Sequence, residues 1–315
     1  MSKAYRHIKI IVNPISGSGR GLGEGMALGR FLQQQGVRID TYITEQAGDA
    51  EQEARRTSIP IIVVGGDGTI NEVINGLEGR RVPLMVFPIG TANLLSREFN
   101  LPRNRADFYS LIQSGAIHYL DVGQVYKPTN RRFLSVAGIG FDGEVTRLMQ
   151  QTRMKSIHLY SYLLPLWQTL RHYSLPSFSL AIDDQTIADK ATSVVIGNIK
   201  NYGGYFSITH RAEADDGWLD ICVFPGKSRK DYLRYLVGVI LGRPTIFSDV
   251  TYYRGKKVEI QSSHPVPIEL DGDFRGYTPF ACEVVPKSVF LLLSSPGPRV
   301  KRFVRKGRKS RRMKR

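Results

Sequence analysis

The sequence predicts two architectures in succession: an N-terminal doubly wound α/β domain and a C-terminal antiparallel β-sandwich. Over the first ~120 residues, apolar runs that end in glycine turns alternate with helical patterns, which is typical of a parallel sheet with helices on both faces. Beyond that point short alternating strands and turn signals recur, which favours a sandwich. We place the boundary near residue 122. The expected parts are residues 1–122, residues 123–295, whose last strand is allowed to return to the first domain, and a tail at 296–315.

Four strands and five helices are expected in the first domain. The predicted strands are Ile8–Val12, Gly36–Thr44, Ile59–Val64 and Pro83–Phe87. The predicted helices are Gly25–Gln35, Gly48–Arg56, a segment that opens after Thr69, a segment that follows the turn Pro88–Leu95, and Ala106–Ser114.

The stretch Gly65–Thr69, Gly-Gly-Asp-Gly-Thr, is the clearest candidate for a ligand-binding turn. It follows the apolar run Ile61–Val64 and opens a helical pattern, so that strand, tight turn and helix start succeed one another. Glycine lets a backbone approach a ligand closely, and a helix N-terminus offers free N–H groups to an anion. With the carboxylate of Asp67, the turn favours a nucleotide and a metal ion over phosphate alone. A purely structural turn with an aspartate cap is the alternative.

Two further polar turns follow predicted strands of the same domain. The first begins at Asn13, but it does not satisfy G-x-G-x-x-G, because Leu22 stands where the third glycine is needed, and no P-loop lysine follows. The second, Pro88–Leu95, carries a hydroxyl and an amide in Thr91 and Asn93. Because ligands of doubly wound sheets bind beyond the carboxyl ends of the strands, we expect all three turns to converge on one edge.

The second domain is predicted to contain short strands interrupted by two helices. The expected strands are Arg132–Val136, Phe178–Ile182, Ser193–Ile196, Trp218–Phe224, Lys257–Ile260, Pro267–Leu270, Phe280–Val285 and Val289–Leu293. The expected helices are Ser156–His172, with Pro165 in its middle, and Asp231–Leu241. Both helices are rich in apolar residues. They either pack in the core or form an apolar cleft wall or membrane-facing surface.

The formal net charge of +16 is concentrated at the C-terminus. Arg299–Arg315 holds eleven Lys or Arg residues and no acid, which leaves +5 for the rest of the chain. Such a segment is expected to be disordered alone. Its charge suits the anionic surface of a phospholipid membrane. A solvated or nucleic-acid-sticking tail is the alternative, and no specific nucleic-acid partner is expected.

Cysteine content and hydropathy indicate the compartment. Cys222 and Cys282 lie in strand-like apolar contexts and are expected to be buried, reduced thiols. The N-terminus runs straight into a strand without a targeting segment, and no apolar stretch approaches the ~20 residues that span a bilayer. We therefore expect a cytoplasmic protein that meets a membrane only peripherally, from its inner face.

Four acidic sites lie on predicted turns: Asp67, Asp121, Asp215-Asp216 and Asp271-Gly272-Asp273. Phosphoryl transfer needs phosphate positioning, a divalent cation to spread charge, and a base near the acceptor hydroxyl. Mg²⁺ prefers carboxylate oxygens, water and phosphate. An isolated Asp-Gly pair is commonly a hairpin turn. The six histidines lack metal-ligand spacing and no Gly-x-Ser-x-Gly elbow is present, so no competing chemistry is favoured.

In these motifs the chain resembles the diacylglycerol kinase catalytic family, which includes bacterial lipid kinases and sphingosine and ceramide kinases. The resemblance rests on four motifs in order and covers about residues 7–294: Asn13-Pro14 with its glycines, Gly65–Thr69, Pro88–Asn93 and Asp271-Gly272. It implies an ATP- and Mg²⁺-dependent lipid kinase whose active site lies between a nucleotide-binding α/β domain and a β-sandwich. Diacylglycerol is the first candidate acceptor, with a phosphatidate-type product.

The resemblance also implies roles for individual residues. The implied ATP-binding residues are Asn13, Pro14, Ser16, Gly17, Thr44, Gly66, Asp67, Gly68, Thr69, Asn71, Glu72, Thr91 and Asn93. Asp67 is similar to the aspartate that organises the Mg-ATP site and helps to activate the acceptor. The loop Ala212–Asp220 resembles the second metal loop of the family, with the carboxylate of Asp216 and the backbone carbonyls of Glu213 and Trp218 as ligands.

One departure from the family pattern concerns the base. Many bacterial members have Asp-Gly-Glu where this chain has Asp271-Gly272-Asp273, and the proton acceptor of the family lies in that motif. Asp273 is one methylene shorter than glutamate. The base is therefore assigned to Asp273 or Asp271, with Asp273 slightly ahead by alignment.

Three other functions stay open from the sequence. An NAD kinase-like enzyme uses a similar Gly-Gly-Asp-Gly-Thr turn, although Asn13-Pro14 and Asp271-Gly272 suit the lipid kinases better. A sphingoid base or phosphatidylglycerol also offers a primary hydroxyl as acceptor. A non-catalytic binding protein is not favoured, because every acidic position is present. Nothing in the sequence predicts the oligomeric state.

Overall fold

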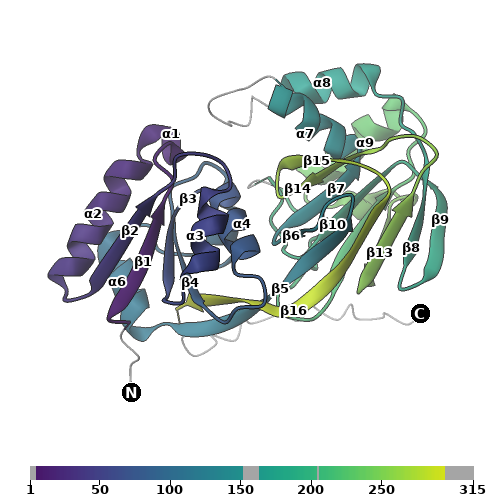
Figure 1. Ribbon diagram of the computed structural model, residues 1–315. Helices are drawn as coiled ribbons and strands as arrows, with labels where there is room; N and C mark the ends of the chain where they lie inside the picture. Colours follow the sequence, from purple (N-terminus) through teal and green to yellow (C-terminus); the bar gives the residue numbers. More distant parts are fainter. Residues whose placement is uncertain (1–4, 152–162, 204–205, 295–315) are drawn as a thin grey trace, which may run out of the picture.

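The computed structural model describes residues 5–151, 163–203 and 206–294 of the 315-residue chain, as two domains joined by long strands (Figure 1). The basic segment Arg299–Arg315 lies outside the described residues, as does the first part of the predicted helix Ser156–His172. The predicted fold class is confirmed: an α/β domain is followed by an antiparallel sandwich.

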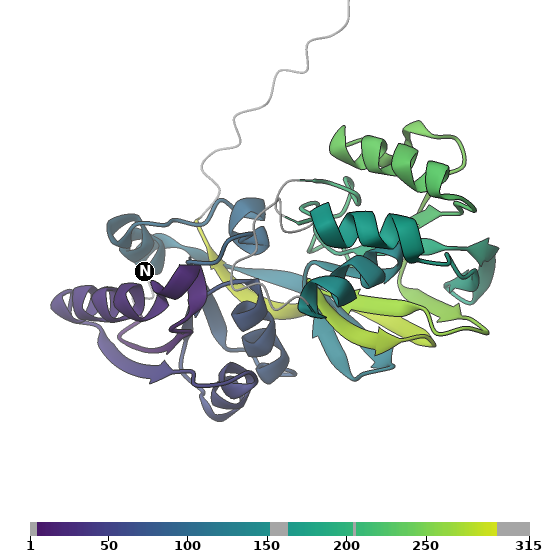
Figure 2. The ribbon, with the colours of Figure 1, turned by 90° about the horizontal axis from the view of Figure 1, so that it is seen from above.

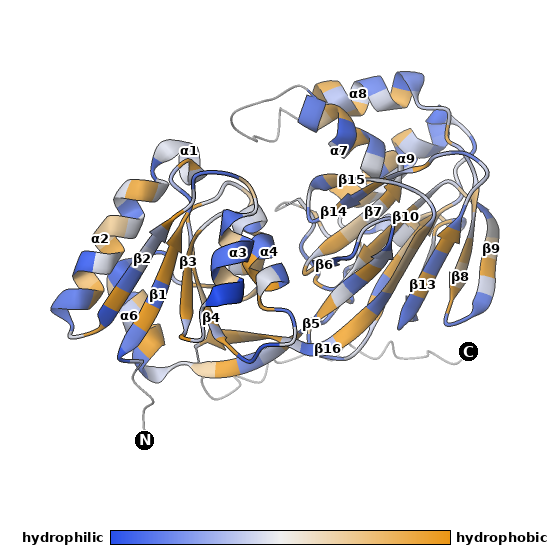
Figure 3. Ribbon diagram, in the orientation of Figure 1, coloured by the Kyte–Doolittle hydropathy of each residue, from blue (hydrophilic) through white to orange (hydrophobic). Residues whose placement is uncertain are grey.

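Four parallel strands form the sheet of the first domain, in the order β2-β1-β3-β4. They are β1 (His7–Val12), β2 (Arg38–Ile43), β3 (Ile61–Gly65) and β4 (Pro83–Pro88). In β3 every side chain is buried, as expected for a strand covered on both faces. Hydrophobic residues accordingly concentrate on β1 and β3 (Figure 3).

Helices cover both faces of this sheet, which makes it doubly wound. On one face α2 (Gly21–Gln34) and α6 (Arg105–Ser114) bury Leu28, Leu32 and Phe108 against β1, β3 and β4. On the other face α3 (Asp49–Arg56) and α4 (Asp67–Gly76) bury Ala54 and Val73. The short helices α1 (Ser16–Gly19) and α5 (Leu94–Glu98) lie in the loops that follow β1 and β4.

One sheet continues through both domains. The strand β16 (Phe280–Leu293) pairs in parallel with β4 and antiparallel with β13 (Lys257–Gln261). Along most of its length it also pairs with β5 (Ala116–Lys127), which itself runs across residue 122. The sheet ends with β8 (Phe178–Ile182) and β9 (Gln185–Ala191), while β6 (Arg131–Phe133) pairs with β5.

The second sheet is wholly antiparallel and completes the sandwich. Its order is β12-β11-β10-β7-β14-β15. The strands are β7 (Val136–Gly140), β10 (Ser193–Gly197), β11 (Leu219–Phe224), β12 (Thr251–Gly255), β14 (Pro267–Leu270) and β15 (Asp273–Tyr277). Phe133, Phe178 and Phe280 fill the core between the two sheets.

Three helices cover the outer face of the second sheet. They are α7 (Phe141–Gln151), α8 (Leu163–His172) and α9 (Arg229–Ile240), and the 3-10 turn η2 (Pro244–Ile246) follows α9. Seen from above, α8 and α9 lie side by side over the second domain (Figure 2). No helix in the described part of the chain is long and apolar enough to cross a membrane.

The structure corrects several predicted elements. The two strands predicted at Phe280–Val285 and Val289–Leu293 are the single strand β16, whose register shifts between Val285 and Val289 at a bulge. Pro165 is the third residue of the described part of α8, and the residues before Leu163 lie outside the described residues. The predicted strand Arg132–Val136 covers the end of β6 and only the first residue of β7. The sequence analysis also missed α1, α7, β9, η2, β12 and β15. Both cysteines are buried and free, as predicted.

Candidate active site

The carboxyl ends of β3 and β4 bring two glycine turns into contact. A Cβ built on Gly90 would lie only 2.6 Å from the Cα of Gly66, so the two turns require glycine to approach this closely. The backbone N–H of Ile89 donates to the carbonyl of Gly65 at 3.1 Å. Thr91 is exposed beside this contact, and Asn93 is buried and donates to the carbonyl of Gly90. The predicted convergence of these turns is therefore observed.

The turn after β1 joins the same edge through Asn13. Its side-chain amide donates to the hydroxyl of Thr69 at 3.0 Å, and its side-chain oxygen accepts from the N–H of Ile15 at 3.2 Å. Gly17 adopts φ +62°, and a Cβ there would lie 2.4 Å from Ile89 Cγ2. Pro14 and Ser16 are half-buried beside it, and Thr44 is buried, with its backbone N–H donating to the carbonyl of Val12.

Asp67 begins helix α4 with its carboxylate directed at the neighbouring turn. One of its oxygens accepts a hydrogen bond from the backbone N–H of Leu94 at 2.8 Å. Burial raises the pKa of Asp67 to about 6, and the nearby charge of Asp271 also raises it. Gly68 is exposed and Glu72 is half-buried on the same helix. A carboxyl with a raised pKa on a glycine-rich edge is a marker of a functional site.

The second domain reaches this edge through Asp271. Asn71, on the buried side of α4, donates from its side-chain nitrogen to Asp271 Oδ2 at 2.7 Å and to the carbonyl of Arg132 at 3.0 Å. Asp271 lies in the turn between β14 and β15 with φ +49°. This contact joins the two domains at the position expected from the sequence motifs.

The two aspartates of the Asp-Gly-Asp turn have different environments. Besides Asn71, the carboxylate of Asp271 accepts backbone N–H bonds from Leu134, Ser135 and Val136 at 2.8–2.9 Å, so its acceptor sites are filled. Burial raises its pKa, against the opposing effect of these donors. Asp273 is 45% exposed and accepts from Arg275 at 2.7 Å and from Gln150 at 3.3 Å.

The predicted metal loop forms a separate cluster. Asp121 is fully buried and accepts from the backbone N–H groups of Gly217 at 2.7 Å and Lys287 at 2.8 Å. Asp216 forms an ion pair with Arg254 and also accepts from the N–H of Trp218 at 3.1 Å. Each oxygen of the Asp216 carboxylate thus has one hydrogen-bond donor, and the metal-binding role of this loop stays a prediction. Groups of three or more metal-binding side chains are absent from the described residues.

Two buried acids beside the Asp271–Asp273 turn were missed by the sequence analysis. Glu269 is the second-last residue of β14, and its side chain accepts a hydrogen bond from the N–H of Gly272 at 2.7 Å. Asp142, in the first turn of α7, lies against Glu269 and accepts from the hydroxyl of Tyr202. The sequence signal was Phe141-Asp142-Gly143-Glu144 directly after an apolar strand, which has the same strand-to-acidic-turn pattern as Gly65–Thr69.

Two family models cover almost all of the described chain. Residues 7–125 match the diacylglycerol kinase catalytic domain, and residues 135–293 match the YegS C-terminal NAD kinase beta sandwich-like domain. The fold and the matches to these two family models define the class of protein, which is a two-domain kinase. It belongs to the diacylglycerol kinase catalytic family, and kinases of this family use ATP as their phosphoryl donor.

Named relatives agree with this assignment. A diacylglycerol kinase of Mycobacterium tuberculosis is 28% identical over 294 residues, covering 90% of this chain and 94% of that one. A diacylglycerol kinase of Staphylococcus aureus is 26% identical over 283 residues, covering 87% and 88%.

Solved structures agree as well. A structure of a diacylglycerol kinase from Bacillus anthracis superposes with a TM-score of 0.73 at 25% identity, covering 94% and 99% of the two chains. An NAD kinase from Archaeoglobus fulgidus, solved in complex with ATP, gives a TM-score of 0.50 at 10% identity over 92% and 93% of the chains, which shows a shared fold alone.

Proposed function

We propose that the protein transfers the γ-phosphoryl group of ATP to the hydroxyl of a membrane lipid, with diacylglycerol as the first candidate and phosphatidate as the product. The observation that carries this proposal is the junction between the domains. A glycine-rich edge that carries Asp67 faces the Asp271–Asp273 turn of the sandwich, to which Asn71 binds directly. A nucleotide on one side and an acceptor on the other would meet at this junction.

The glycine turns are the proposed phosphate-binding surface. Backbone N–H groups at the start of α4 point toward the edge, and the helix dipole favours an anion there. The contacts of Asn13 with Thr69 and of Gly66 with Gly90 hold three turns in one arrangement before a ligand arrives. The ATP-binding role of these residues and of Thr44, Asn71, Glu72, Thr91 and Asn93 is part of the proposal.

The carboxylates divide the remaining tasks. One carboxylate oxygen of Asp67 accepts from Leu94, and the other does not bind that residue. Mg²⁺ is usually held by one or two carboxylates together with phosphate oxygens and water. The Asp67 carboxylate therefore fits this ion. When bound, Mg²⁺ would spread the charge that develops on the phosphates. Asp273 is the proposed base, because the oxygens of Asp271 are already filled by hydrogen bonds, whereas Asp273 is partly exposed.

An exposed apolar surface on the second domain supports a substrate that resides in a bilayer. Leu233, Val237 and Ile240 follow one another along one side of α9 and are 53%, 51% and 66% exposed. We define the apolar docking face as these residues together with further exposed apolar side chains at the end of α9, on η2 and on α8: Leu241, Ile246, Leu163, Leu164 and Trp167. Exposed apolar side chains in such number favour an interaction site.

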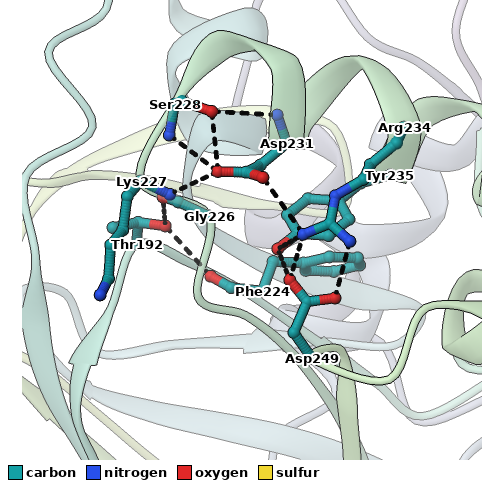
Figure 4. A network of polar contacts seen from close by, with 9 residues as sticks. All are labelled: Thr192, Phe224, Gly226, Lys227, Ser228, Asp231, Arg234, Tyr235 and Asp249. Carbon is teal, nitrogen blue, oxygen red and sulfur yellow. Dashed lines mark hydrogen bonds and ion pairs between the residues drawn. The ribbon is translucent and has the colours of Figure 1, made fainter.

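Polar contacts hold the other side of α9 against the second domain (Figure 4). The apolar docking face of the helix therefore points away from the domain. Ser228 and Asp231 form a capping box at the start of the helix. Arg234 binds Asp231 and Asp249, and the Tyr235 hydroxyl donates to Asp249 at 2.6 Å. Exposed cations flank the apolar side chains at Lys227, Arg229, Lys230, Arg243 and Arg171. An apolar face with a basic rim is suited to an anionic membrane surface.

We also propose that the protein associates with the inner face of the membrane from the cytoplasm, through this face and the basic segment Arg299–Arg315. Each basic residue near an anionic surface contributes about 1 kcal/mol. A chain truncated at Ser295 should bind anionic vesicles less tightly and keep its turnover on detergent-dispersed lipid. Unchanged vesicle binding would exclude the segment from docking.

The acceptor is identified by phosphorylating a total lipid extract with the purified protein, Mg²⁺ and ATP, and analysing the products by mass spectrometry. A phosphatidate product supports diacylglycerol. A phosphorylated sphingoid base or phosphatidylglycerol would change the acceptor but leave a lipid kinase. Phosphorylation of NAD without any lipid product would overturn the proposal.

A further inference from the structure

Two carboxyl groups lie against each other beneath the Asp-Gly-Asp turn. Glu269, on β14, is 2% exposed, and Asp142, on α7, directs a buried Oδ2 atom at it. Asp142 Oδ2 and Glu269 Oε1 lie next to each other, and neither has a hydrogen-bond donor among the described residues. Two such buried carboxyl oxygens can satisfy each other only when one carboxyl is protonated and donates to the other.

The surrounding contacts indicate which carboxyl holds the proton. Burial raises the pKa of Asp142, but its Oδ1 accepts from the Tyr202 hydroxyl, which opposes that effect and makes Asp142 the more readily ionised member of the pair. Burial and the charge of Asp142 raise the pKa of Glu269 well above its usual range, and Asp271 adds to this effect. Lys, Arg and His partners for either carboxyl are absent from the described residues, so no cation offsets a second negative charge.

The fold makes room for this pair at a glycine. Gly138 of β7 is the register partner of Glu269, and a Cβ on Gly138 would lie 2.0 Å from Asp142 Oδ2 and 2.9 Å from Glu269 Oε1. The other oxygen of Glu269 accepts from the N–H of Gly272 at 2.7 Å. The pair therefore connects α7 and β7 to the residue that separates Asp271 from Asp273.

We propose that Glu269 is a positioning residue: as the protonated member of a pair with Asp142, it fixes the Gly272 amide and thereby the orientation of Asp273. Asp271 is held separately, by the backbone of residues 134–136. Gly272 adopts φ +88°, in the left-handed region that favours glycine, and the Glu269 side chain accepts the hydrogen bond of its amide. The link to catalysis rests on the proposed function, whereas the geometry of the turn does not.

Glu269→Gln and Glu269→Ala form the matched test, with Glu259→Ala on strand β13 of the other sheet as control. Glutamine offers a carbonyl oxygen to the Gly272 amide and an N–H donor to Asp142. These replace the carbonyl oxygen and the O–H donor of protonated glutamate. Hydrogen exchange of the Gly272 amide at neutral pH should be similar in wild type and Glu269→Gln and at least about tenfold faster in Glu269→Ala. After correction for the intrinsic rise of amide exchange with pH, loss of the shared proton at alkaline pH should lower the protection of the Gly272 amide in wild type but not in Glu269→Gln.

Turnover with Mg-ATP and lipid gives the second readout. Glu269→Ala should lower kcat by about tenfold or more and change the KM for ATP less than twofold, because the nucleotide edge belongs to the first domain. Glu269→Gln should keep most of the turnover and extend it to higher pH.

Slow Gly272 exchange in Glu269→Ala, or the same alkaline change in wild type and Glu269→Gln, would overturn the proposal. If Glu269→Ala does not fold, the alkaline comparison still decides. Absence of lipid turnover in wild type would reject the proposed function and leave the exchange test intact.

Discussion

Asn71 of α4 donates a hydrogen bond of 2.7 Å to Asp271, a residue 200 positions further along the chain. The same nitrogen donates to the carbonyl of Arg132 at 3.0 Å, so one buried amide joins the first domain to two segments of the second. Because buried polar groups are costly when left without a partner, this contact fixes how the two domains meet at the proposed site.

Replacing Asn71 should weaken the junction. Asn71→Leu removes the donor to two buried acceptors and should lower the free energy of unfolding by about 1–3 kcal/mol. Asn71→Asp should cost little at pH 4 and more at pH 8, because the negative charge of Asp271 raises the pKa of the introduced carboxyl and its ionisation opposes folding. Denaturant unfolding at both pH values measures this difference, and a pH-independent effect would contradict it.

The ionised Asp67 carboxylate should lower the free energy of unfolding of the protein at neutral and alkaline pH. Its folded pKa of about 6 exceeds the unfolded value of 3.8, so its contribution to stability is greatest below pH 4 and is lost as the pH rises through 6. Asp67→Asn should therefore stabilise the protein at pH 8 by up to about 3 kcal/mol and much less at pH 4. Equal effects at both pH values in thermal unfolding would show that the carboxyl is not destabilised by burial.

Gly17 should be required by the turn after β1. Gly17→Ala places a Cβ 2.4 Å from Ile89 Cγ2 in a conformation with φ +62°, so it should displace the turn and raise the KM for ATP about fivefold or more. Gly23→Ala is the control, because a Cβ there meets nothing within 4 Å and the residue lies in α2, where alanine favours the helix. Similar KM values for the two variants would argue against a nucleotide at this turn.

The apolar docking face should contribute to membrane binding without supporting the fold. Leu233→Ser with Ile240→Ser removes two exposed side chains and should weaken binding to anionic vesicles by about tenfold or more. Tyr126→Ser, a change at a 51% exposed residue of β5, is the control. Vesicle sedimentation gives the comparison, and equal binding by both variants would remove this face from the proposal.

The sequence predicted the fold class because local patterns determine most of it. Apolar runs followed by glycine turns located the parallel strands and the edge that carries Asp67. The continuous sheet could not be predicted, because β16 pairs with β4 about 200 residues earlier through contacts that no local pattern encodes. The predicted domain boundary at residue 122 falls inside β5, whose pairing with β16 extends across it.

The candidate site was predicted by residue type more than by arrangement. The sequence did not decide between Asp271 and Asp273 as the base. The hydrogen bonds to Asp271 from Asn71 and residues 134–136, and the exposure of Asp273, distinguish them. The contact of Asp216 with Arg254 could not be predicted either, since it joins the loop before β11 to strand β12. Glu269 is an ordinary strand residue in sequence, and its pairing with Asp142 depends on the space above Gly138.

The central claim is that Asp67 serves ATP-dependent phosphorylation of a lipid. The most direct measurement compares wild type with Asp67→Ala in transfer of labelled γ-phosphate from Mg-ATP to diacylglycerol in mixed vesicles, with NAD as a parallel acceptor. The account predicts labelled phosphatidate from wild type, a loss of about a hundredfold or more in Asp67→Ala, and no label on NAD. Full turnover in Asp67→Ala, or label on NAD alone, would contradict it.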